Sequence, residues 1–213
     1  MRRIVIIFTL LMTLSLNSFC QVSVVVKAGV NLSSYSGLNS NEKNLQEYKT
    51  GYIFSAGIEI PLVAGLYVEP ALSLVKKGTQ LFGKADRANI SMEVNPTYIE
   101  VPIMMGYRFP ILESVSLTLY TGPYFSYGFG GSWKYKSTNG SHNADAFGNT
   151  LDIEKNEAFT KKRWDYGVGV GAGIEVDDFL FQTTYALGLA QVRTGAYGIL
   201  KNRGLAFSVG YRF

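Results

Sequence analysis

The only histidine of the chain, His142, lies beside Ser141 and close to Asp145 in a polar segment. A serine, a histidine and a carboxylate are the residue types of a hydrolytic triad, but nothing in the sequence fixes the geometry that a triad requires. We interpret the three as polar loop residues and predict that the protein is not an enzyme. The alternative is a surface ligand binder or small enzyme that uses segment 128–162.

The same segment carries carboxylates of the kind that bind hard cations. They lack the spacing of a calcium-binding loop, so we interpret them as solvent-exposed and predict no metal and no cofactor. These residues are Asp145, Asp152, Glu154 and Glu157.

Other charged residues recur in short motifs that read glycine, apolar, charged, apolar. The motifs are Gly57–Ile60, Gly106–Phe109, Gly173–Val176 and Gly210–Phe213. In a β-strand, successive side chains point to opposite faces, so each motif places its charge on the glycine face and its apolar pair on the other. We predict an inward-facing network of ion pairs, since unpaired buried charges would be costly. Its members are Lys27, Glu59, Glu69, Glu100, Arg108, Glu175 and Arg212.

Glu69 and Glu100 each lie next to a proline and have the residue type of an acid/base pair. On inward faces of neighbouring strands, we expect them instead to accept hydrogen bonds from lysine or arginine.

Eight segments with period-two alternation must position these charges. They are 22–32, 50–60, 66–77, 97–109, 115–127, 163–176, 179–191 and 203–213. Each has about the ten residues that a tilted membrane strand needs. Long loops, the longest at 128–162, alternate strictly with short turns along the chain. This pattern predicts an all-β fold, an eight-stranded antiparallel up-and-down transmembrane β-barrel with short periplasmic turns, long extracellular loops and both termini in the periplasm.

An energetic argument decides which strand face meets lipid. Turning the charged faces outward would expose the inward lysine, arginines and glutamates, at a total cost on the order of 10 kcal/mol. The lumen of an eight-stranded barrel is narrow enough for side chains to fill. We therefore predict a plugged, charge-paired lumen and not a channel. A soluble lipocalin-like calyx is the less favoured alternative, because its charges would face outward.

Glycines and aromatic residues follow the same alternation. Gly167, Gly169, Gly171 and Gly173 share the inner face of one strand, where we expect them to leave room for Arg108 and Arg212; a ligand slot is the alternative. Two aromatic groups are typical of interfacial girdles. The outer group is Tyr124, Tyr127, Trp133, Tyr135, Trp164 and Tyr166, and the inner group is Phe109, Phe179, Tyr211 and Phe213.

Basic residues flank the longest loop near the outer rim, namely Lys134, Lys136, Lys161, Lys162 and Arg163. Clustered bases attract anionic headgroups, so we expect contact with lipopolysaccharide phosphates; a solvated loop base is the alternative. The aromatic end of the last strand, with Tyr211 and Phe213, resembles the signal that outer-membrane assembly machinery reads. An envelope protein partner is also expected.

Residues 1–20 have the pattern of a secretory signal peptide, with Arg2 and Arg3 before an apolar run and small residues at Ser18 and Cys20. We predict cleavage before Gln21, leaving residues 21–213 as the barrel domain; a lipidated Cys20 is the alternative. The composition of 14% aromatic and 17% charged residues suits an all-β chain. The net charge of +4 is too mild to suggest nucleic acid.

Three segments resemble the PorT-like outer-membrane β-barrel family: Tyr98–Phe109, Leu66–Gly78 and Val26–Leu32. The resemblance covers most of the chain after residue 20. It implies an eight-stranded barrel in a Gram-negative outer membrane. It implies no activity, because the namesake's link to protein secretion does not transfer on fold alone.

Overall fold

The computed structural model describes residues 22–37, 46–85, 88–137, 140–147, 162–191, 193–195 and 198–213. These residues form β-strands joined by turns. The strands are β1 (Ser23–Ser36), β2 (Gln46–Pro61), β3 (Leu66–Lys76), β4 (Thr79–Ala85), β5 (Ala88–Leu112), β6 (Val115–Ser137), β7 (Gly140–Asp145), β8 (Trp164–Val176), β9 (Phe179–Gly188), β10 (Arg193–Gly195) and β11 (Gly198–Arg212). Within the described ranges, no helix is long and apolar enough to cross a membrane.

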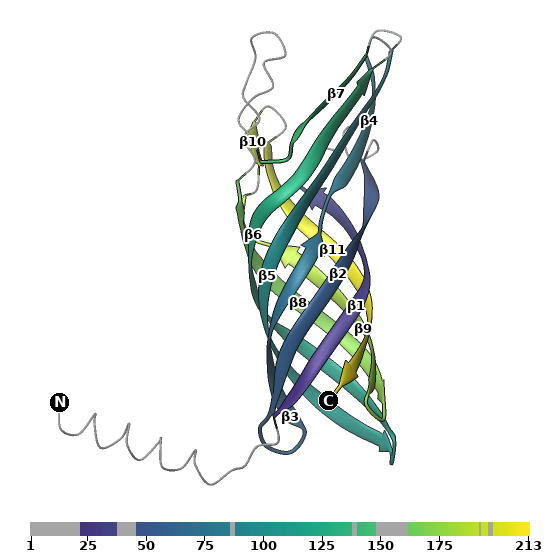
Figure 1. The fold of residues 1–213 in the computed structure, drawn as a ribbon, viewed down its shortest axis with the longest axis vertical. Coiled ribbons are helices and arrows are strands. Elements are labelled where there is room, and N and C mark those ends of the chain that lie inside the picture. The colour runs from purple at the N-terminus through teal and green to yellow at the C-terminus, as the bar shows by residue number, and fades with distance from the viewer. Residues whose placement is uncertain are drawn as a thin grey trace, which may run out of the picture.

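Eight of the strands pair into a closed antiparallel ring. The order around the ring is β1, β2, β3, β5, β6, β8, β9 and β11. β11 pairs again with β1 along most of β1, from Val25–Arg212 to Ser36–Lys201. Figure 1 shows the strands winding obliquely around one axis, with β1 and β11 side by side. The predicted eight-stranded up-and-down barrel is confirmed.

The strands are strongly staggered around the ring. A path that goes once around the barrel, stepping from each residue to its partner on the next strand, starts on β1 at Val25. It passes through Gly57, Tyr124 and Asn202 and returns to β1 at Tyr35, ten residues beyond its start. Such a stagger accompanies strand tilt in a closed barrel. A row of neighbouring side chains therefore climbs toward the long-loop rim as it runs from β1 toward β3.

The sheet continues past the segments that the alternation predicts as strands. β4 continues β3 after a break at Lys77 and Gly78 and pairs with the upper part of β5, while β6 runs on to Ser137 and pairs with β7. Figure 1 shows these extensions rising beyond the ring. The prediction that 78–95 and 128–162 are wholly loops is therefore wrong. In the upper part of β5, Ile90, Met92 and Val94 alternate with polar residues, so a short one-sided apolar pattern is present there. β4 and β7 show no such pattern.

Tight turns connect the strands at the opposite rim, as predicted. In the β2–β3 turn, the Leu62 amide donates to the Leu66 carbonyl at 2.7 Å, and Gly65 has a φ of 85°. The β8–β9 turn consists of Asp177 and Asp178, and Asp177 has a φ of 50°. Glycine and aspartate tolerate this left-handed backbone better than most residues.

Side-chain burial alternates with a period of two along the ring strands. In β8, residues Asp165, Gly167 and Gly169 are buried, while Tyr166 and Val168 between them are exposed. Large apolar side chains dominate the exposed face, and polar and charged ones are frequent in the interior. The interior of this ring is therefore polar, the reverse of a soluble calyx.

Candidate functional site: the barrel lumen and its outer surface

Four charged side chains meet inside the ring near the short-turn rim. Arg108 contacts Glu59 at 2.9 Å and Glu175 at 2.7 Å. Arg212 contacts Glu59 at 3.4 Å and also pairs with Glu175. Each carboxylate thus lies between two guanidinium groups, and we call this closed set the quartet. Its four members are the charges of the four repeated motifs, brought together from β2, β5, β8 and β11.

A second ion pair crosses the middle of the lumen. Lys27 of β1 contacts Glu69 of β3 at 2.6 Å, and its ammonium also donates to the Gln182 side-chain oxygen at 2.9 Å. Glu69 is almost fully buried. The pair therefore spans three walls of the barrel, from β1 and β3 to β9.

The third set of charges centres on Lys77, at the break between β3 and β4. Its ammonium contacts Glu100 at 2.7 Å and Asp165 at 3.1 Å. It also lies over the rings of Tyr98 and Tyr124, at 5.1 and 4.5 Å from their centroids. All of these side chains are buried. We call Lys77, Glu100 and Asp165 the Lys77 cluster.

Neutral side chains complete the Lys77 cluster. Ser126 donates to Glu100 at 2.7 Å, and the Asn202 amide donates to Asp165 at 2.8 Å. Charge-assisted hydrogen bonds of this kind are shorter and stronger than those between neutral groups. They fix the two carboxylates against β6 and β11.

All seven charges predicted to face inward lie in these three sets, but two members of the Lys77 cluster were missed. Lys77 and Asp165 have the inward parity of β3 and β8, so alternation contained the signal. Their importance depends on neighbours from other strands, which the stagger of the barrel determines. Among the described residues, no group of three or more histidine, cysteine or acidic side chains is arranged to hold a metal.

A cavity of about 80 Å³ lies inside the barrel between the Lys27–Glu69 pair and the Lys77 cluster. Its lining includes Ser73, Tyr120 and Gln182 besides the charged residues. This space accommodates a few water molecules, but not a ligand of drug size. Side chains therefore fill most of the described lumen.

Two of the four inward glycines lie against tyrosine rings, and none has an arginine among its nearest neighbours, so the space predicted for Arg108 and Arg212 is not there. A Cβ atom on Gly171 would lie 2.4 Å from the Tyr120 ring, and one on Gly167 would lie 2.7 Å from the Tyr124 ring. Met104 and Gln182 face Gly169 and Gly173. The glycine face is occupied by packed neighbours, because tyrosines from β6 reach across to β8.

We expect Gly106→Ala to lower the free energy of unfolding by about 1–3 kcal/mol through overpacking. The added Cβ would lie 2.3 Å from Cζ of Tyr67, whose buried ring lies beneath the Arg108 guanidinium. Urea-induced unfolding in lipid vesicles measures the change. Gly130→Ala is the matched control, because a Cβ there meets no atom within 4 Å and should change stability by less than about 0.5 kcal/mol. Equal effects of the two substitutions would contradict this packing.

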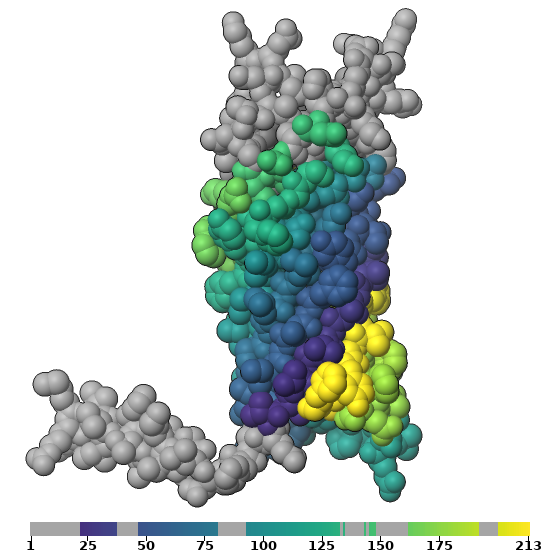
Figure 2. Space-filling view, viewed as in Figure 1, coloured from purple at the N-terminus to yellow at the C-terminus, as the bar shows by residue number. Residues whose placement is uncertain are grey.

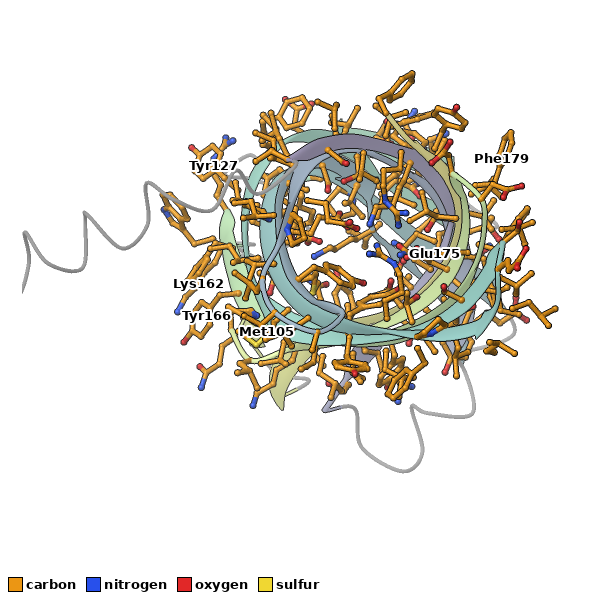
Figure 3. All side chains as sticks on the ribbon, turned by 90° about the horizontal axis from the view of Figure 1, so that it is seen from below. Met105, Tyr127, Lys162, Tyr166, Glu175 and Phe179 are labelled. Carbon is orange, nitrogen blue, oxygen red and sulfur yellow. The ribbon has the colours of Figure 1, made fainter. Side chains whose placement is uncertain are left out.

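The outer surface of the ring carries a belt of exposed apolar side chains. Examples from across the belt are Phe54, Leu72, Ile103, Leu119, Val170, Ile174, Phe181 and Val209. Viewed along the barrel in Figure 3, Glu175 points into the ring, while Met105, Tyr127, Tyr166 and Phe179 project outward. Such a belt is typical of a surface in contact with hydrocarbon.

Aromatic contacts flank the belt on both sides. Tyr127 packs against Trp164 toward one rim, and Tyr211 packs between Phe179 and Phe213 toward the other. Tyr124 was predicted in the outer group, and that placement is wrong. It has inward parity on β6 and only 1% of its surface is exposed, because its ring lies beneath Lys77.

Several residues considered for the outer rim are only partly described. Lys162 and Arg163 are exposed just before β8, and Lys134 lies on β6. The side chains of Ser141, His142, Trp133, Tyr135 and Lys136 are outside the described part, as are Asp152, Glu154, Glu157 and Lys161 entirely. The described structure therefore does not bring these residues into one site.

Residues 18–193 match the protein family described as "Outer membrane protein beta-barrel domain". The chain belongs to this family. Membership places the protein in the outer membrane as a β-barrel, in agreement with the closed ring and its apolar belt. A comparison with curated proteins found no match.

Among solved structures, the chain is similar to Ail, the attachment invasion locus protein of Yersinia pestis, solved with the heparin analogue sucrose octasulfate. The identity is 16%, the coverage is 90% of this chain and 99% of Ail, and the TM-score is 0.42. OprG from Pseudomonas aeruginosa has 12% identity, coverage of 90% and 95%, and a TM-score of 0.45. Neisserial surface protein A has 11% identity, coverage of 89% and 97%, and a TM-score of 0.44.

Proposed function

We propose that this outer-membrane barrel has a structural or interaction role at the cell surface and is not a channel. The observation that carries the proposal is the occupation of the lumen by the quartet, the Lys27–Glu69 pair and the Lys77 cluster, with a cavity of only about 80 Å³ between the latter two. Ions would have to displace three sets of buried charges to pass. A role without catalysis is part of the same proposal.

We propose further that the long-loop rim faces outward, with both termini in the periplasm. The short turns at one rim and the strand extensions at the other support this orientation, since outer-membrane barrels have short periplasmic turns. Residues 1–20 would then be the removed signal peptide. We also propose that the protein is a PorT-like barrel of a Gram-negative outer membrane, which is a more specific statement than its family membership.

Two envelope contacts belong to the proposal. Lys134, Lys136, Lys161, Lys162 and Arg163 would meet lipopolysaccharide phosphates at the outward rim; Lys162 and Arg163 are exposed, as such contact requires. Tyr211 and Phe213 would be read by the barrel-assembly machinery, and their rings, in edge-to-face contact, lie on the lipid-facing side. The surface partner would be an envelope protein.

We expect the purified barrel to give no steady ion current in a planar lipid bilayer, because charged side chains fill its lumen. Single-channel recording checks this, with a porin in the same bilayer as the positive control. A stable current of uniform step size from the wild-type barrel would contradict the plugged lumen.

A further inference from the structure

A groove runs along the lipid-facing side of β11, β1, β2 and β3. It is a shallow, open groove of about 770 Å³ and not an enclosed cavity. Its floor includes the small residues Ala28 and Ala56, and larger apolar side chains flank them, namely Phe54, Leu72, Leu74, Ile99, Val209 and Tyr211. Figure 2 shows part of this face, where β11 in yellow and β1 in purple lie side by side.

The groove rises obliquely from near the short-turn rim toward the upper end of β3. Its lowest residues are near Phe179 and Tyr211, close to the short-turn rim, and its highest are Leu74 and Ile99 on β3 and β5. It climbs because rows of paired residues rise from β11 and β1 toward β3 in this staggered barrel. A chain lying in it would therefore cross the apolar belt obliquely and emerge beside the end of β3.

The ammonium group of Lys76 lies at the upper end of the groove. Lys76 is two residues beyond Leu74 on the same outer face, and its ammonium lies 5.9 Å from the centroid of the Tyr52 ring. Lys76 has no ion-pair partner among the described residues, in contrast to its inward neighbour Lys77. An outward lysine at the edge of an apolar belt is suited to an anionic headgroup.

A second cation lies farther up the same face. The Arg203 guanidinium is 5.8 Å from the centroid of the Tyr48 ring, and its Nε donates to Ser34 at 2.8 Å. Tyr48 and Tyr52 are four residues apart on β2, about 13 Å along that strand, so the two cations lie near different rings of one strand. Two separated cations above one groove suit a lipid with more than one phosphate better than a lipid with a single one.

We propose that the β11–β1–β2–β3 face is a specific site for the lipid A part of lipopolysaccharide. One acyl chain would lie in the groove over Ala28 and Ala56, while Lys76 and Arg203 bind phosphates at the rim. This site is separate from the described basic residues near the longest loop: Lys134 on β6, and Lys162 and Arg163 just before β8, lie on strands across the ring from β1. The inference rests on the proposed outward orientation of the long-loop rim.

Native mass spectrometry of the barrel in mild detergent tests the site. The barrel is mixed with equal amounts of bisphosphorylated lipid A, phosphatidylglycerol and phosphatidylethanolamine. We expect preferential retention of one lipid A, and we expect Lys76→Gln or Arg203→Gln to weaken it about tenfold by removing one charge-assisted contact. The double variant Ala28→Leu with Ala56→Leu fills the groove and should weaken retention comparably.

Ala172→Leu is the control, because it makes the same Ala→Leu change once, at an exposed alanine on β8 away from the groove. It should leave lipid A retention unchanged, and heat-modifiable gel mobility verifies that every variant is folded. Retention that falls with Lys162→Gln but not with Lys76→Gln would overturn this site while supporting the proposed loop contact. Equal retention of phosphatidylglycerol, or unchanged retention in the groove-filling variant, would also overturn it.

Discussion

Replacing Lys77 by methionine is expected to lower the free energy of unfolding by about 3–5 kcal/mol, because it leaves buried carboxylates without their counter-charge. The ammonium contacts Glu100 at 2.7 Å and Asp165 at 3.1 Å, and no other lysine or arginine of the described part is ion-paired with either of them. Reversible urea unfolding in lipid vesicles, followed by tryptophan fluorescence, measures the loss. This is one of the two largest effects that we expect from a single substitution.

Two comparisons separate lost charge pairing from other causes. Lys76→Met alters the adjacent residue on the outer face and should change stability by less than about 1 kcal/mol, since Lys76 is only partly buried and makes no ion pair among the described residues. Adding Glu100→Gln and Asp165→Asn to Lys77→Met should recover much of the loss, because neutralising a whole buried network is often nearly cost-free. A loss in the triple variant as large as in the single one would show that packing, not charge, dominates.

The second large effect concerns the outer surface. Val170 lies at the centre of β8, and half of its surface is exposed. Val170→Arg should lower the free energy of unfolding in a bilayer by about 2–4 kcal/mol, because it places a cation at the membrane midplane. The same urea titration in vesicles measures the change.

The control for Val170→Arg is the same substitution at an outward position nearer the membrane surface. Val176 ends β8 beside the short turn and also faces outward. Val176→Arg should cost only about 0–1 kcal/mol, because the side chain reaches the interface. If the two arginines had equal and small effects, the belt would be in contact with water and not with lipid.

Period-two alternation was sufficient to predict the ring and the inward charges. It works because each ring strand separates lipid from a polar lumen, so one face must be apolar. It also assigned inward parity to Lys77 and Asp165, but not their contact, because residues from β3 and β8 meet only through the register and stagger of the strands between them.

Other features left little or no signal in the sequence. β4 and β7 lie beyond the belt and lack a one-sided apolar pattern. The upper part of β5 does alternate, with Ile90, Met92 and Val94 on one face, but this short pattern falls in a segment that was predicted to be a loop. The contact of Gly167 and Gly171 with tyrosine rings could be predicted only by knowing which strands are neighbours. Tyr124 was placed at a girdle by residue type, although its parity pointed to the lumen.

A cysteine scan along β8 tests the central claim most directly. In a chain produced from Gln21 onward, Cys20 is absent, so each introduced cysteine is the only one and can carry a single spin label. We predict that outward positions from Trp164 to Val176 collide with dissolved oxygen most strongly near Val170, as lipid-facing sites do. Labels at inward positions should collide weakly with both oxygen and a water-soluble nickel chelate. Collision of the Val170 label with the chelate in place of oxygen would contradict a membrane-embedded barrel with its charges inside.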